Sequence, residues 1–206
     1  MPTATFFHLP EEKRERLNNA AWDEFTRVPY AEASINRIVS AARIPRGSFY
    51  QYFEDKNDLF SYIIDQLRGG FLQLLDQIRE DTGGDIFAIP MHALDAFILP
   101  DGSVAPRYKR DFALLQLNRS MDMTAIFLRQ SGKELCAQGL PEGWGSSELR
   151  RSDALFADCT FTMLVAALGT AIAHIVFDPT SRARESELLS LRVDIIRNGS
   201  AVGGKG

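Results

Sequence analysis

The stretch ASINRIVSAARIPRGSFYQYFEDK, residues 33–56, decides the fold of the chain. It carries three arginines, one lysine and four aromatic residues, and no acidic residue occurs from Ala33 to Phe53. The chain as a whole, in contrast, has a formal net charge of −4. The stretch is therefore a local excess of basic charge within an acidic protein.

Hydrophobic spacing predicts two short helices joined by a tight turn in this stretch. The first helix is indicated by apolar residues at i, i+3, i+4 and i+7, namely Ile35, Ile38, Val39 and Ala42. Ser34 precedes it and is a residue type that caps helices. The second helix holds Phe49 and ends near Phe53. Two short helices connected in this way have the layout of a helix-turn-helix.

The polar residues around the second helix are of types that bind DNA. Arginine reads guanine bidentately, glutamine reads adenine, and serine or tyrosine hydroxyls bond phosphates. Gly47 lets the backbone approach closely, and Lys56 can hold a phosphate together with the dipole of the next helix. The missing acids fit this interpretation, because the DNA backbone would repel them. The alternative is a solvated basic surface over a three-helix core.

The order of residues in SINRIVSAARIPRGSFYQYFEDKNDLF, residues 34–60, resembles the DNA-binding domain of TetR-family transcriptional regulators. The resemblance covers about residues 10–60. It implies an all-α protein with an N-terminal three-helix DNA-binding domain that contains the helix-turn-helix. The DNA-binding residues it implies are Ser34, Asn36, Arg43, Pro45, Arg46, Gly47, Ser48, Tyr50, Gln51, Tyr52 and Lys56.

Two positions depart from the family pattern. Arg43 stands where the pattern has its turn glycine, so a left-handed backbone there would cost energy. Pro45 stands where a serine usually caps the recognition helix; proline suits a helix start, but one capping bond is lost. Both departures bear on the detailed base contacts and neither affects the fold.

Helical periodicity continues through the rest of the chain. Pro10 followed by two acids predicts a helix start, and Asp55 can cap a long helix that the segment DTGGD, residues 81–85, ends. Further helices are expected at about 85–99, 105–119, 121–138, 147–177 and 181–198. Gly69 and Gly70 interrupt the long helix, and we interpret them either as a hinge or as a close packing site for another helix.

By resemblance, a DNA-binding domain at residues 1–56 precedes a larger helical effector-binding and dimerisation domain at 57–200, and 201–206 form a disordered tail. The last two long helices would make a homodimer. They contain small residues that permit close approach, Ala166, Ala167, Gly169, Ala171 and Ala173, and apolar residues, Leu188, Leu189, Ile195 and Ile196. The residues that could bind a small apolar or amphipathic effector are His92, Tyr108, Phe112, Gln116, Phe127, Phe156 and Cys159. The alternative is that these residues belong to the ordinary hydrophobic core.

Several classes of function find no support in the sequence. Cys136 and Cys159 form no C-x-x-C pair and the three histidines are far apart, so no metal or other cofactor is expected. No nucleophile elbow, phosphate-binding loop or zinc-protease motif is present, which argues against an enzyme. The uncharged run at residues 159–177 is long enough to span a bilayer, but its alanine, glycine and threonine content favours a buried packing helix.

The sequence therefore predicts a cytoplasmic, ligand-responsive transcriptional regulator, most simply a repressor. It would bind a pseudo-palindromic double-stranded operator as a homodimer and leave it when a small effector binds. The alternative function is a helical adaptor that binds proteins and not DNA.

Overall fold

The structure is a computed structural model that describes residues 1–118, 129–130, 133–134 and 149–201. Within these residues the chain is helical apart from one short pair of strands and two isolated bridges, which confirms the all-α fold. The chain forms two compact units, Met1–Gly70 with Arg110–Ser131, and Phe71–Lys109 with Gly132–Gly206.

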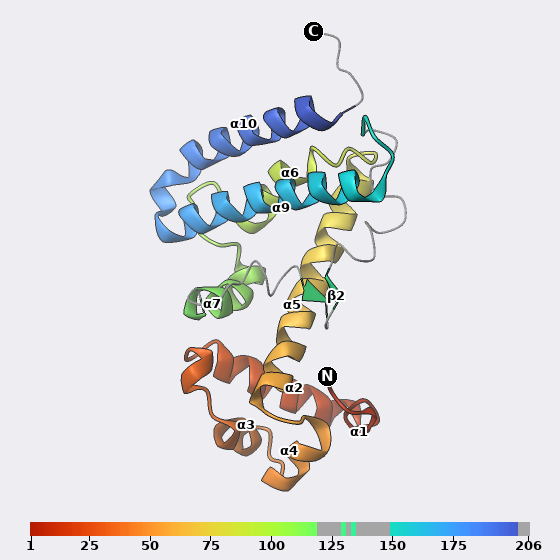
Figure 1. The fold of residues 1–206 in the computed structure, drawn as a ribbon. Helices are drawn as coiled ribbons and strands as arrows, with labels where there is room; N and C mark the ends of the chain where they lie inside the picture. The colour runs from red at the N-terminus through yellow and green to blue at the C-terminus, as the bar shows by residue number, and fades with distance from the viewer. Residues whose placement is uncertain (119–128, 131–132, 135–148, 202–206) are drawn as a thin grey trace. The chain divides into compact units, whose positions relative to one another are not determined.

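The first unit surrounds one apolar core (Figure 1). Its elements are α1 (Ala4–Phe7), α2 (Glu11–Phe25), the 3-10 turn η1 (Tyr30–Glu32), α3 (Ile35–Ala41), α4 (Arg46–Tyr52), the first part of α5 (Lys56–Asp81), and α7 (Lys109–Leu117). The domain boundary predicted after residue 56 lies inside this unit, because α5 contributes core residues from Leu59 to Leu67 and α7 contributes Leu114.

Local signals set the helix starts of this unit as predicted. Pro10 is the N-terminal flanking residue of α2, and the acids Glu11 and Glu12 occupy the first turn. The carboxylate of Asp55 accepts a hydrogen bond from the backbone N–H of Asp58 at 2.8 Å and so caps α5. The helix-turn-helix is α3 and α4, whose residues Ile38, Val39, Phe49 and Tyr52 are buried.

The glycine pair in α5 does not break the helix, which runs continuously through Gly69 and Gly70. A Cβ atom added at either glycine would meet no atom of the described residues within 4 Å. The close-packing interpretation is therefore wrong for the described part of the chain. The boundary between the two units falls directly after Gly70. The helix ends as predicted, followed by Gly83 and Gly84 with φ of 69° and 96°.

The second unit is built around a helical hairpin. After the end of α5 come α6 (Ile89–Phe97), the 3-10 turn η2 (Pro106–Tyr108), α9 (Ala154–Phe177), the 3-10 turn η4 (Pro179–Ser181) and α10 (Arg182–Ser200). Helices α9 and α10 lie side by side, and both contact α6 (Figure 1). Ion pairs from Arg182 to Asp95 and from Arg197 to Asp85, both 2.5 Å, tie α10 to the rest of the unit.

The predicted helix at 121–138 is wrong where the structure describes it. Arg129–Gln130 (β1) and Lys133–Glu134 (β2) pair as two short strands. The intervening Ser-Gly dipeptide is a turn signal, and two residues between extended segments favour a hairpin. The helix expected at 147–177 begins later, at Ala154, where Asp153 caps it by accepting from the backbone N–H of Phe156 at 3.0 Å.

Helix α9 contains the uncharged run that raised the question of a membrane span. By length and hydropathy alone it could cross a bilayer, with a mean hydropathy of 1.9 in its most apolar window. One of its faces is nevertheless buried, including Phe161, Leu164 and Leu168, and it packs against α6 and α10. α9 is therefore a partly buried packing helix, as the sequence composition favoured.

Candidate nucleic-acid interface

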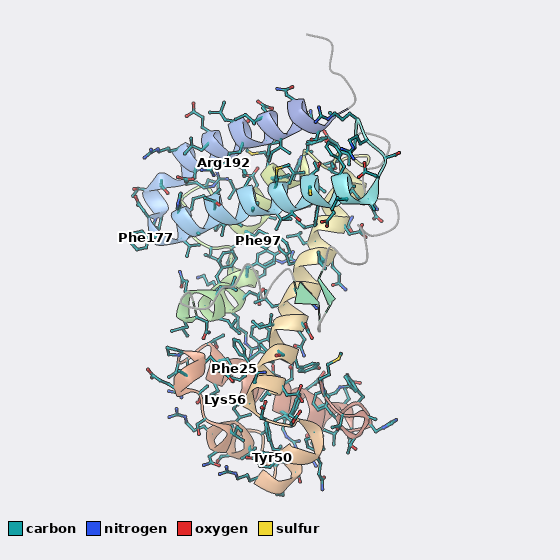
Figure 2. The ribbon with its side chains drawn as sticks, in the orientation of Figure 1. Phe25, Tyr50, Lys56, Phe97, Phe177 and Arg192 are labelled. Carbon is teal, nitrogen blue, oxygen red and sulfur yellow. The ribbon has the colours of Figure 1, made fainter. Side chains whose placement is uncertain are left out.

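The predicted DNA-binding residues differ in how far they reach the surface. The exposed members of the set are Asn36, Arg43, Pro45, Arg46, Gly47, Tyr50 and Gln51. Ser34, Ser48 and Lys56 are half-buried, and Tyr52 is buried. The surface of α3, the turn and α4 thus presents most of the set, and Figure 2 shows Tyr50 on α4.

Arg46 at the start of α4 gathers two other predicted residues. Its Nη1 donates to Asn36 Oδ1 of α3 at 2.6 Å, and its Nη2 donates to the Tyr50 hydroxyl at 3.3 Å. A guanidinium has five N–H donors, so these bonds orient the group and leave donors for a base edge or a phosphate. This exposed group of Arg46, Asn36 and Tyr50 is suited to read DNA.

The turn between α3 and α4 contains the strained residue that the sequence anticipated. Arg43 has φ of 54°, and among the described residues it is the one non-glycine residue with positive φ. Arginine in a left-handed backbone conformation is strained, whereas glycine adopts this conformation without strain. Pro45 flanks the start of α4, and no side chain caps that helix, as expected from the loss of the usual serine.

Lys56 holds backbone carbonyl oxygens in this structure. Its Nζ donates to the carbonyl oxygens of Tyr30 at 2.7 Å, Ala33 at 3.1 Å and Ala31 at 3.3 Å, and it lies 4.5 Å from the centre of the Tyr30 ring. An ammonium group has three donors, so these contacts use all of them. A phosphate contact by Lys56 stays a prediction, and it would require the ammonium to exchange at least one carbonyl for a phosphate oxygen.

Glu24 is a functional candidate that the sequence interpretation missed. Its side chain is 5 % exposed and lies at the end of α2. Its Oε1 accepts from the backbone N–H of Ser34 at 2.8 Å and from Arg37 Nε at 3.0 Å, while its Oε2 accepts from Arg27 Nη2 at 2.6 Å. The expected cap of α3 needs correction, because the Ser34 side chain makes no capping hydrogen bond. The stretch 33–53 contains no acid, but Arg37 within it pairs with Glu24 of α2.

The electrostatics of Glu24 favour its charged form. Burial raises the pKa of this carboxyl, but hydrogen bonds from Arg27, the Ser34 amide and Arg37 outweigh burial and hold the pKa below its ordinary value. A sequence signal for this residue existed. Leu17, Ala20, Ala21, Glu24 and Phe25 occupy i, i+3, i+4, i+7 and i+8, so the acid stands within an apolar stripe.

An N-terminal segment closes the other end of the helix-turn-helix. Thr3 donates its backbone N–H to the Tyr52 carbonyl at 2.9 Å and its hydroxyl to the Gln51 carbonyl at 2.6 Å. Phe6 is fully buried, with its ring 4.9 Å from that of Phe53. Tyr52 also contacts Phe6, so it is core, and the structure counts against its predicted role as a DNA contact.

The residues predicted to bind an effector are distributed over both units, and their role stays a prediction. Tyr108 is buried, Phe156 half-buried, and His92 and Cys159 exposed in the second unit. Phe112 (buried) and Gln116 (exposed) belong to the first unit, and Phe127 lies outside the described residues. The enclosed space found in the second unit, between Leu75, Ile86 and Phe161, is about 10 Å³, which is room for one water molecule.

Comparison with known proteins identifies the DNA-binding segment. Residues 17–63, which run from α2 through the helix-turn-helix into α5, match the family model for bacterial regulatory proteins of the tetR family. This segment of the chain is of the tetR type. The match agrees with the resemblance that the sequence shows over about residues 10–60.

Similarity to curated transcriptional regulators is concentrated in the same region. The chain is 36 % identical over 63 residues to the transcriptional regulator AcuR of Cereibacter sphaeroides, covering 31 % of this chain and 29 % of AcuR. It is 32 % identical over 74 residues to an HTH-type transcriptional regulator of Staphylococcus aureus, covering 36 % of this chain and 40 % of that protein. The matches thus span less than half of these relatives.

Solved structures extend the likeness in fold along nearly the whole chain. SmeT, the repressor of the Stenotrophomonas maltophilia multidrug efflux pump SmeDEF, superposes with a TM-score of 0.50 at 18 % identity, covering 94 % of each chain. A transcriptional regulator of Pseudomonas aeruginosa superposes with a TM-score of 0.51 at 18 % identity, covering 95 % of this chain and 96 % of the other. At this identity the likeness concerns the fold alone.

Proposed function

We propose that this protein is a cytoplasmic transcriptional regulator of the TetR family that binds a pseudo-palindromic DNA duplex, acts as a repressor and is released by a small apolar or amphipathic effector. The exposed Arg46, Asn36 and Tyr50 group carries the DNA-binding part, because it stands on the helix-turn-helix that the family model matches. A recognition helix places its N-terminal residues on base edges, and Arg46 opens α4.

The proposed homodimer is supported by the surface of the helical hairpin. Helices α9 and α10 leave large apolar side chains in solvent, with Phe177 83 % exposed (Figure 2) and Ile195 72 % exposed, together with Leu155, Met163 and Leu191. Exposed apolar side chains gathered on two adjacent helices are typical of an interface. Leu189, Ala167 and Ala171 are buried within the protomer, so they support the hairpin and do not line the proposed interface.

The effector part of the proposal rests on the second unit and on α5. One boundary between the two units falls in α5 directly after Gly70, where two glycines lower the helix propensity. Gly69 and Gly70 would serve as the hinge through which effector binding changes the angle of the helix-turn-helix.

Fluorescence anisotropy tests DNA binding directly. A labelled duplex from the DNA upstream of the protein's own gene is titrated with protein, with a random duplex of equal length as competitor. The expected result is at least a thousandfold preference for the upstream duplex, lost in Arg46→Ala. Equal affinity for both duplexes would contradict a specific operator, and no binding to either would favour the protein-binding adaptor. Sedimentation that shows a monomer at micromolar concentration would contradict the dimer.

A further inference from the structure

The contacts of Glu24 point to a role that goes beyond folding. The carboxylate joins three parts of the first unit: Arg27 in the turn after α2, the Ser34 amide at the start of α3, and Arg37 within α3. It accepts charge-assisted bonds on both oxygens while being almost fully buried. Breaking one of these hydrogen bonds would cost free energy, because the buried carboxylate would lose a partner without gaining contact with water.

The position of Arg37 matters for DNA binding. In helix-turn-helix complexes the first helix crosses the sugar-phosphate backbone while the second enters the major groove. Arg37 lies on this first helix, and its side chain is 55 % exposed. It would be a natural phosphate ligand if its guanidinium were not directed to Glu24 and, by a bond of 3.3 Å, to the Glu32 carbonyl.

The surroundings leave Arg37 free to move. An open groove of about 390 Å³ lies between α2 and α3 and is lined by the charged residues Asp23, Glu24, Arg27 and Arg37 together with Ala20, Ser40 and Ala41. Charge-assisted hydrogen bonds to Glu24 therefore hold Arg37 on the carboxylate.

We infer that Glu24 is a specificity-determining positioning residue: it withholds Arg37 from DNA phosphates and so keeps sequence-independent binding weak, while it closes the start of α3. This inference rests on the proposed DNA-binding function. Each phosphate that a protein neutralises adds about 0.9 to the slope of log affinity against log salt. Release of Arg37 would therefore strengthen binding to any duplex and steepen its salt dependence.

The test uses the full-length protein and an end-labelled 25-base-pair duplex of random sequence, titrated at several salt concentrations. Glu24→Gln keeps an oxygen for the Ser34 amide but removes the charge, and the slope should steepen by about 0.9. Arg37→Ala alone should leave the slope unchanged, because the arginine is already occupied. The double variant, Glu24→Gln with Arg37→Ala, completes a double-mutant cycle. Its salt slope should return to the wild-type value.

Asp23→Asn is the matched control. It removes the same charge from the neighbouring residue, whose carboxylate pairs with Arg110 of α7 at 2.9 Å and not with Arg37. Its slope should stay at the wild-type value. A steeper slope in this control equal to that of Glu24→Gln would mean that net charge alone is responsible, and would overturn the inference.

Two other outcomes would also overturn it. A wild-type slope in Glu24→Gln would show that Arg37 does not reach phosphate, and a flatter slope in Arg37→Ala would show that it already does so. Arg37→Ala keeps the Glu24 carboxylate and its bonds to Ser34 and Arg27. This variant therefore tests the inference even if Glu24→Gln does not fold. If wild-type protein binds no duplex at all, the proposed function itself fails, a result distinct from the others.

Discussion

Replacing both glycines of α5 by alanine should stabilise the protein and impair its response to effector. Gly69 and Gly70 are in the interior of a helix that runs from Lys56 to Asp81. A Cβ at either position would meet no atom of the described residues within 4 Å, so none of these residues opposes the substitution sterically. Alanine is favoured over glycine by about 0.5–1 kcal/mol per position in a helix interior. The double variant should gain about 1–2 kcal/mol.

Thermal unfolding followed by circular dichroism measures this gain. For a chain of this size, about 1–2 kcal/mol corresponds to a rise in melting temperature of about 2–8 °C. The matched control is Gly102→Ala. Gly102 has φ of 82°, and an added Cβ would overlap the backbone carbonyl of Pro179, so this variant should melt at a lower temperature than wild type.

The same double variant tests the hinge. If the glycines allow α5 to bend when effector binds, Gly69→Ala with Gly70→Ala should bind DNA as well as wild type and be released poorly by effector. Normal release together with the raised melting temperature would refute the hinge. A lowered melting temperature would refute the reasoning from open space around the helix, because it would mean that something packs against the bare backbone.

Further predictions concern single side chains. Arg46→Ala should lose discrimination at one base position by about 1–3 kcal/mol in a mismatch series, whereas Lys56→Ala should weaken binding to all duplexes alike and flatten the salt slope by about one unit. Lys56→Ala should also lower the melting temperature, because three carbonyls lose their donor. Phe6→Ala should cost about 3–5 kcal/mol in urea unfolding, since its ring is fully buried. Because the pKa of Glu24 is lowered in the folded state, its contribution to stability should be complete at neutral pH and disappear as pH falls through that pKa; denaturation series at several pH values should show a weaker loss on acidification in Glu24→Gln.

The sequence predicted those features of the fold that depend on neighbouring residues. Pro10 and Asp55 mark helix starts, and the glycines after residue 82 mark a helix end, because capping and left-handed backbone are local properties. The left-handed Arg43 could be foreseen for the same reason. The strand pair at 129–134 was missed, since a helical interpretation of the longer stretch passed over the Ser-Gly turn signal.

The parts of the site that sequence reasoning missed are contacts between distant residues. Glu24 lies ten residues from the Ser34 amide it holds, and Thr3 lies 48 residues from the Gln51 carbonyl it caps. The apolar stripe of α2 indicates that Glu24 is buried, but no periodic pattern identifies the partners of Glu24 or of Thr3. Their side-chain types are ordinary at the surface, so only the folded arrangement shows that both close the ends of the helix-turn-helix.

The two faces of α4 have a consequence for how this protein can change over generations. Phe49 anchors the helix in the core, while Arg46, Tyr50 and Gln51 stand in solvent. Exposed substitutions usually alter stability by no more than about 0.5 kcal/mol. Mutation can therefore alter the exposed positions one at a time while the fold stays intact. A duplicated copy of the gene would be able to acquire a new target sequence through viable intermediates, without a stabilising change elsewhere.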